Sequence, residues 1–108
     1  MNIESQSSIL GKMKRRSLSP VDLLIDLMDR IEKYDRDIQS YVTLNESAMK
    51  HAEKAEKQYN NGEVIGSLEG IPLSVKDLMD TANLITTYGN AYFRSNVPKK
   101  MQELFKTF

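Results

Sequence analysis

The sequence contains no cysteine, and this absence removes several classes of site at once. Without thiols, the chain can form no disulfide, no thiolate nucleophile and no cysteine-based zinc site. We expect neither a metal nor a cofactor. An excess of charge of one sign is also missing, because 15 basic and 15 acidic residues cancel. No overall field then draws the chain to nucleic acid or to an anionic membrane, and we expect no direct binding of nucleic acid.

Long apolar runs and targeting signals are missing as well. No run approaches the roughly 18 apolar residues that a membrane span requires. The polar N-terminus does not lead into the apolar stretch of a signal peptide. We therefore expect no membrane association and a cytoplasmic location. The 108 residues suit one small domain with a modest core, and they contain no internal repeat.

Helical patterns fill the first part of the chain, about residues 5–62. The spacing of Ile9, Leu10 and Met13 predicts a short first helix. A second helix is predicted from "SPVDLLIDLMDRIEKYD", with Ser19 as its N-cap and Pro20 at its first helical position. The apolar residues expected to share one face of this helix are Val21, Leu24, Met28, Ile31 and Tyr34.

A third helix is predicted from Asn45 onward, in "NESAMKHAEKAEKQYNNG", and it should end at Gly62. Its alanines at 48, 52 and 55 form a narrow face that permits close packing. His51, the single histidine, lies on this helix among charged residues. No partners at suitable spacing accompany it, so we interpret it as a surface or half-buried residue without a catalytic or metal-binding role.

One lysine stands within the apolar run "GIPLSVKDLMDTANLITTYGN", residues 70–90. The pattern predicts a short strand in "LSVKD", and "IQSYVTL" is a second possible strand. On a strand, Ser74 and Lys76 share a face and Asp77 points to the other. Spacing alone leaves two interpretations open for Lys76: a surface charge, or a buried base beside a serine.

The residues around Lys76 favour a catalytic role for this lysine. The Gly70-Ile71-Pro72 turn, the Lys76-Asp77 pair, Asp80 and "LITTYG" at 84–89 together resemble the amidase signature family, with likeness over roughly residues 5–98. Members of this family hydrolyse carboxamides with a Ser–cis-Ser–Lys triad, and the resemblance places Lys76 on the catalytic lysine. The apolar strand would keep that lysine dry and in place. Ser74 falls on a variable family position, so it is not expected to be the nucleophile.

The resemblance also implies a fold. The family has an α/β architecture, with a mixed sheet between helices. The chain would supply the N-terminal helices and the first strands of that sheet, with the lysine strand in a part spanning about residues 63–98. A C-terminal tail, residues 99–108, does not continue the family pattern.

The two family serines lie in a "GGSSGGS"-like loop downstream of the lysine, and no such loop occurs here. We expect the N-terminal fragment of one amidase-type domain, truncated by a frameshift or premature stop and inactive alone. A small amide would be the substrate of the complete enzyme.

Two alternatives stay open. A C-terminal helix is predicted to open at Asn96 and Pro98. The chain could be a non-catalytic interaction module that binds a protein partner, or itself, through the apolar face of this helix at Leu104, Phe105 and Phe108. It could also come from the amidase subunit of a glutamyl-tRNA amidotransferase, a member of the same family.

Overall fold

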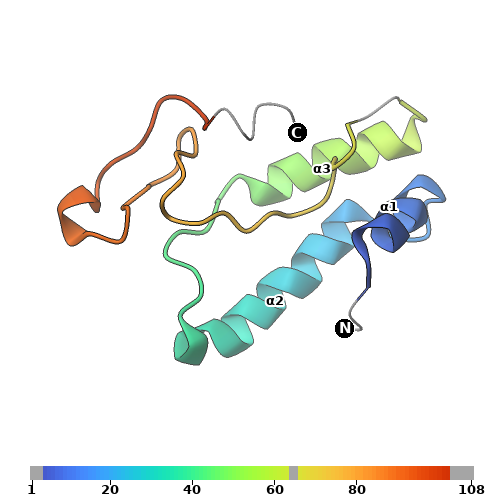
Figure 1. Cartoon of the computed structure of the whole chain (residues 1–108). Coiled ribbons are helices and arrows are strands. Elements are labelled where there is room, and N and C mark those ends of the chain that lie inside the picture. Colours follow the sequence, from blue (N-terminus) through green and yellow to red (C-terminus); the bar gives the residue numbers. More distant parts are fainter. Residues whose placement is uncertain (1–3, 64–65, 103–108) are drawn as a thin grey trace. The chain divides into compact units, whose positions relative to one another are not determined.

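Three α-helices and one short 3-10 helix form the regular structure of the chain in this computed structural model, which describes residues 4–63 and 66–102. These elements are α1 (Gln6–Lys14), α2 (Pro20–Ile38), α3 (Ala48–Asn60) and η1 (Ala91–Phe93) (Figure 1). The chain divides into two compact units. Unit 1 comprises Met1–Ser40 and Glu46–Pro72, and unit 2 comprises Tyr41–Asn45 and Leu73–Phe108.

The predicted α/β class is wrong for this structure, because the described residues contain helices and no β-strand. The expected strand "LSVKD" is irregular backbone that leads into a turn, and "IQSYVTL" is irregular after the end of α2. Alternating apolar residues indicate a segment that could be half buried. A strand also needs a neighbouring backbone to pair with its N–H and C=O groups. No described segment forms such a ladder with either stretch.

The start of α2 is formed as predicted. The hydroxyl of Ser19 accepts hydrogen bonds from the backbone N–H groups of Val21 (3.0 Å) and Asp22 (3.3 Å). These N–H groups belong to the first helical turn and have no partner within the helix. The same hydroxyl donates to the carboxylate of Glu56 on α3. One serine therefore both caps α2 and connects it to α3.

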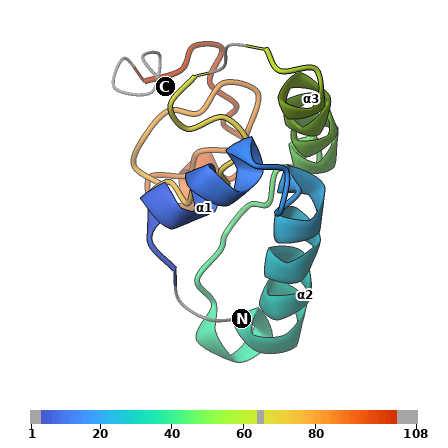
Figure 2. The ribbon, with the colours of Figure 1, turned by 90° about the vertical axis from the view of Figure 1, so that its right-hand side faces the viewer.

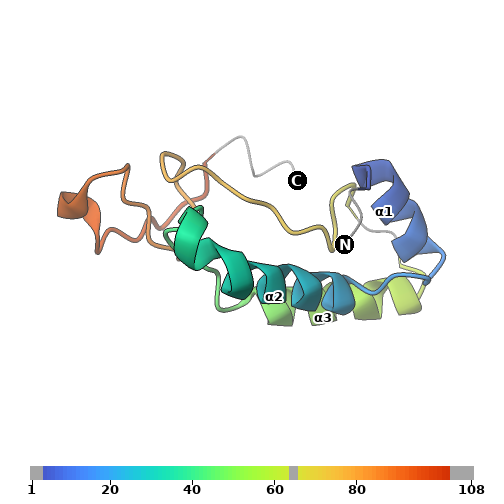
Figure 3. The ribbon, with the colours of Figure 1, turned by 90° about the horizontal axis from the view of Figure 1, so that it is seen from below.

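The core of unit 1 forms where the three helices meet. Met13 of α1 is completely buried and packs with Leu23 of α2 and Tyr59 of α3. Figures 1 and 3 show α2 and α3 lying side by side in opposite directions, and Figure 2 shows α1 beside the first turns of α2. The small-residue face of α3 is confirmed, because Ala52 and Ala55 are buried.

The predicted apolar face of α2 is only partly correct. Leu24 is buried, but Met28 and Tyr34 are 36% and 46% exposed. Leu23 and Leu27 contribute to the core in their place. The helix has apolar residues around more than half of its circumference, so its own periodicity does not determine which of them meet α1 and α3.

The turn that begins "GIP" is attached directly to this core. The hydroxyl of Tyr59 donates to the backbone carbonyl of Glu69 at 2.9 Å. Gly70 then adopts a left-handed conformation with φ of +81°, and a Cβ atom there would lie 3.0 Å from the Cγ atom of Pro20. Glycine is required at this position by both its backbone angle and its surroundings.

Two further predictions concern a membrane-spanning helix and a C-terminal helix. None of the helices in the described ranges combines the length and the apolar character needed to cross a bilayer. Residues 96–102, predicted to open a C-terminal helix, are irregular. The proposed apolar face of that helix, Leu104, Phe105 and Phe108, lies outside the described residues.

Gly70→Ala should lower the free energy of unfolding of unit 1 by about 3 kcal/mol, through backbone strain and the contact with Pro20. Gly62→Ala is a matched control. Gly62 also has a positive φ, of +67°, but nothing lies within 4 Å of a Cβ atom there. It should cost only about 1 kcal/mol. Urea unfolding followed by circular dichroism measures both. Equal losses in the two variants would contradict the crowding at Gly70.

Candidate functional site around Lys76

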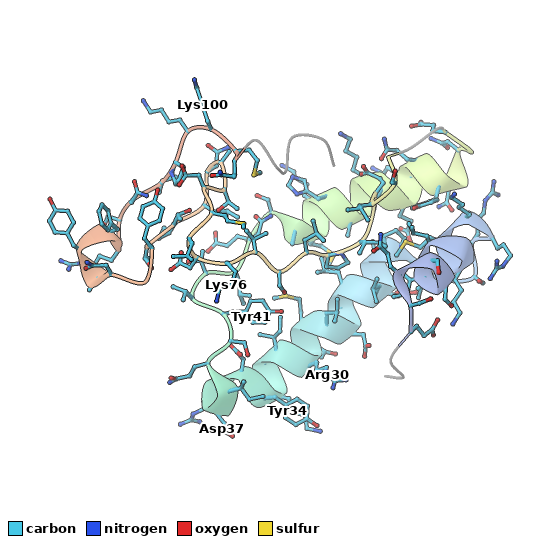
Figure 4. The ribbon with its side chains drawn as sticks, in the orientation of Figure 1. Arg30, Tyr34, Asp37, Tyr41, Lys76 and Lys100 are labelled. Carbon is cyan, nitrogen blue, oxygen red and sulfur yellow. The ribbon has the colours of Figure 1, made fainter. Side chains whose placement is uncertain are left out.

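Lys76 lies in unit 2, in irregular backbone just before a turn in which the N–H of Met79 donates to the carbonyl of Lys76 at 3.0 Å. Its side chain is exposed, as Figure 4 shows. The expectation of a lysine kept dry by an apolar strand is therefore wrong for this structure. Within residues 4–63 and 66–102, its ammonium group takes part in no hydrogen bond or ion pair. Its catalytic role remains a prediction.

Ser74 has a different partner from the one that strand spacing suggests. Its hydroxyl lies 2.7 Å from the hydroxyl of Tyr41, 33 residues earlier in the chain, and either group can donate. This hydrogen bond connects the segment after α2 with the lysine segment inside unit 2. The spacing of residues in the sequence could not predict Tyr41 as the partner of Ser74, because the two lie in separate irregular segments.

Asp77, the residue after Lys76, is bound to the "TTYG" turn, mainly through Thr87. One carboxylate oxygen accepts the backbone N–H of Thr87 at 2.8 Å, and the other accepts the hydroxyl of Thr87. The hydrogen bond from the Thr87 hydroxyl, followed by the one from its backbone, lowers the pKa of Asp77. Donors that favour the charged carboxylate act in this direction. Sequence reasoning named the Lys-Asp pair and the "TTYG" motif, but not their contact.

The segment that contains Thr87 is attached to the chain that follows it. Thr86 is the one fully buried residue in the described part of unit 2, and its N–H donates to the carbonyl of Asn96 at 2.9 Å. The amide of Asn96 donates back to the carbonyl of Thr86, also at 2.9 Å. Thr87 therefore follows a residue whose backbone is fixed on both sides.

A second carboxylate contacts the same segment. The hydroxyl of Tyr88 donates to the carboxylate of Asp80, and this hydrogen bond raises the pKa of Tyr88. The carbonyl of Asp80 accepts the N–H of Gln102 at 2.8 Å. Tyr88 and Gly89 both have positive φ, 55° and 73°, so the chain turns sharply here. Both acidic residues of the motif thus bind the "TTYG" turn, although neither contacts the Lys76 amine.

The chemical capacity of this site is that of one accessible amine. A neutral lysine can accept a proton, but covalent catalysis also requires a nucleophile within reach of that base. Ser74 is bonded to Tyr41, and the sequence contains no glycine–serine loop. The arrangement can supply a base to a nucleophile from elsewhere.

Comparison with known proteins identifies the relationship. Residues 22–107 match the model of the Amidase family. A glutamyl-tRNA(Gln) amidotransferase subunit of Carboxydothermus hydrogenoformans is 34% identical over 95 residues, covering 87% of this chain and 20% of that protein. The corresponding mitochondrial subunit of Homo sapiens is 32% identical over 95 residues, covering 87% and 18%. That of Ornithorhynchus anatinus is 36% identical over 91 residues, covering 83% and 17%. The chain spans about a fifth of the length of these curated relatives.

The contact between Asp77 and Thr87 should weaken in acid. Since the folded pKa of Asp77 lies below its ordinary value of 3.8, the stability that it contributes is present above that value and is lost as the pH falls through the lowered pKa. The amide signal of Thr87 in an NMR titration should therefore move with a midpoint below 3.8. In Asp77→Asn this movement should disappear. A midpoint at or above the ordinary value would show that the contact does not form in solution.

Proposed function

The chain belongs to the amidase family, and on that premise we propose that it contributes the catalytic lysine, Lys76, of an enzyme that hydrolyses carboxamides. The observation that carries this proposal is the position of Lys76 inside the family match, within the "GIP…KD…TTYG" motif. Its exposed side chain also supports the proposal, because a nucleophile from outside this segment could reach the amine.

In the proposed reaction, neutral Lys76 accepts a proton that passes through a cis-serine from a nucleophilic serine. The serine oxygen forms a bond to the amide carbon, and the amine leaves after it takes up the proton. Water then attacks the resulting ester and releases the carboxylic acid. Backbone N–H groups of a glycine-rich loop stabilise the oxyanion in both steps.

Both serines must come from outside these 108 residues, because the sequence has no glycine–serine loop. A catalytic set without its nucleophile loses nearly all of its rate advantage. The chain alone is therefore inactive in this proposal, and a small amide is the substrate of the complete enzyme.

A second candidate follows from the names of the relatives, which are subunits of glutamyl-tRNA(Gln) amidotransferases. In this role the chain would be part of one subunit in a multiprotein complex, and the ammonia would pass to a partner subunit. The location is then open between compartments, since the relative in Homo sapiens is mitochondrial and the cytoplasm remains our prediction. The interaction-module alternative also stays a prediction.

The purified chain should release no ammonia from simple carboxamides above a buffer blank, because no serine nucleophile is available to the base. A coupled ammonia assay measures this. Lys76→Ala and Lys100→Ala form a matched pair, since both lysines are exposed and lie in unit 2. Turnover that Lys76→Ala abolishes and Lys100→Ala retains would mean that the chain contains its own nucleophile.

Translation of the DNA after the Phe108 codon in three frames should reveal a glycine–serine-rich loop. In the protein that joins this loop to residues 22–107, Lys76→Ala should lower kcat by a factor on the order of 10⁴, as loss of a catalytic base does. Lys100→Ala should leave kcat unchanged. Full activity of the Lys76→Ala enzyme would refute the role of Lys76, and absence of the loop would favour the interaction module.

A further inference from the structure

We propose that Asp77 is a positioning residue for Lys76, and that Thr87 keeps it in that role. Two consequences follow from the contact between them. The backbone next to Lys76 is fixed to the "TTYG" turn, and the Asp77 carboxylate is directed toward that turn. The inference rests on the proposed function in one respect, namely that Lys76 is the reactive lysine.

The first consequence follows from connectivity. Both carboxylate oxygens of Asp77 accept hydrogen bonds from one residue, Thr87, ten positions along the chain. Thr87 is in turn covalently joined to Thr86, whose exposed fraction is 1% and whose backbone is bound on both sides by Asn96. Lys76 itself lies in irregular backbone. The contact between Asp77 and Thr87 therefore connects the backbone at Lys76 to Thr86, the buried residue of unit 2.

The second consequence concerns charge. A carboxylate adjacent in sequence to a lysine can pair with its ammonium group, and such a pair favours the protonated amine. Here the N–H and the hydroxyl of Thr87 occupy one carboxylate oxygen each. Among the described residues, the ammonium of Lys76 has no ion pair. Thr87 thus directs this carboxylate to the "TTYG" turn, and the side chain of Lys76 is exposed.

The Asp80–Tyr88 contact provides an internal comparison. It connects an acidic residue of the same motif to the neighbouring residue of the same turn, through a tyrosine whose side chain is exposed. Asp80 lies four positions after Lys76, whereas Asp77 is its direct neighbour. Loss of the Tyr88 hydroxyl should therefore affect the turn but not the lysine.

The test uses the full ¹⁵N-labelled chain and two NMR measurements, the exchange rate of the Thr87 amide and the heteronuclear NOE of the Lys76 amide. In Asp77→Ala, Thr87 should exchange about tenfold faster, as for the loss of one hydrogen bond. The Lys76 NOE should fall below its wild-type value. The near-isosteric Thr87→Val should lower the Lys76 NOE in part, and Thr87→Ser, which keeps the hydroxyl, should restore the wild-type value. Tyr88→Phe should leave Lys76 unchanged.

An unchanged Lys76 NOE in both Asp77→Ala and Thr87→Val would overturn the inference. An equal fall in Tyr88→Phe would also overturn it, because the effect would then belong to the turn as a whole. Should Asp77→Ala fail to fold, the Thr87→Val and Thr87→Ser pair decides the question alone. These NMR measurements require neither the two catalytic serines of the proposed enzyme nor any amide hydrolysis. A dispensable Lys76 in the loop-containing enzyme would refute the proposed function and leave the NMR result standing.

Discussion

Unit 1 depends on the burial of Met13 between α2 and α3. Met13 is the largest side chain that loses all contact with water, and it brings Leu23 and Tyr59 together. Tyr59 then extends the effect of this apolar contact to the backbone, because its hydroxyl binds the carbonyl of Glu69 just before the "GIP" turn. The position of the "GIP" turn in unit 1 is thus fixed by one of the residues that form its core.

Unit 2 is organised by a different kind of interaction. Its described residues include one fully buried side chain, Thr86, which is polar. Order comes from hydrogen bonds between side chains and backbone: Asp77 with Thr87, and Asn96 with Thr86. A single hydrogen bond contributes only about 1 kcal/mol of net stability. The geometry around Lys76 is therefore sensitive to single substitutions that remove one donor or acceptor.

The family match and the structure describe different aspects of Lys76. The match over residues 22–107 establishes the family and includes Lys76, but it cannot show what contacts the lysine. The structure adds its surroundings within the described residues: an amine with no hydrogen bond, an Asp77 carboxylate bound by Thr87, and Ser74 bound to Tyr41. If Lys76 is the base that we propose, its nucleophile must be brought to it, since the sequence contains no glycine–serine loop.

The sequence alone determined the three helices of unit 1 and the start of α2, but not the start of α3, which is Ala48 rather than Asn45. A cap such as Ser19 acts within one helical turn, and the spacing of the alanines in α3 repeats every three or four residues. Only the tertiary structure decided which side of α2 is buried, because α1 and α3 select it. It also decided that "LSVKD" forms no strand and that Asp77 meets Thr87. A ladder and a contact across ten residues each need a partner that local sequence does not place, so the family could be recognised from the sequence while the surroundings of Lys76 could not.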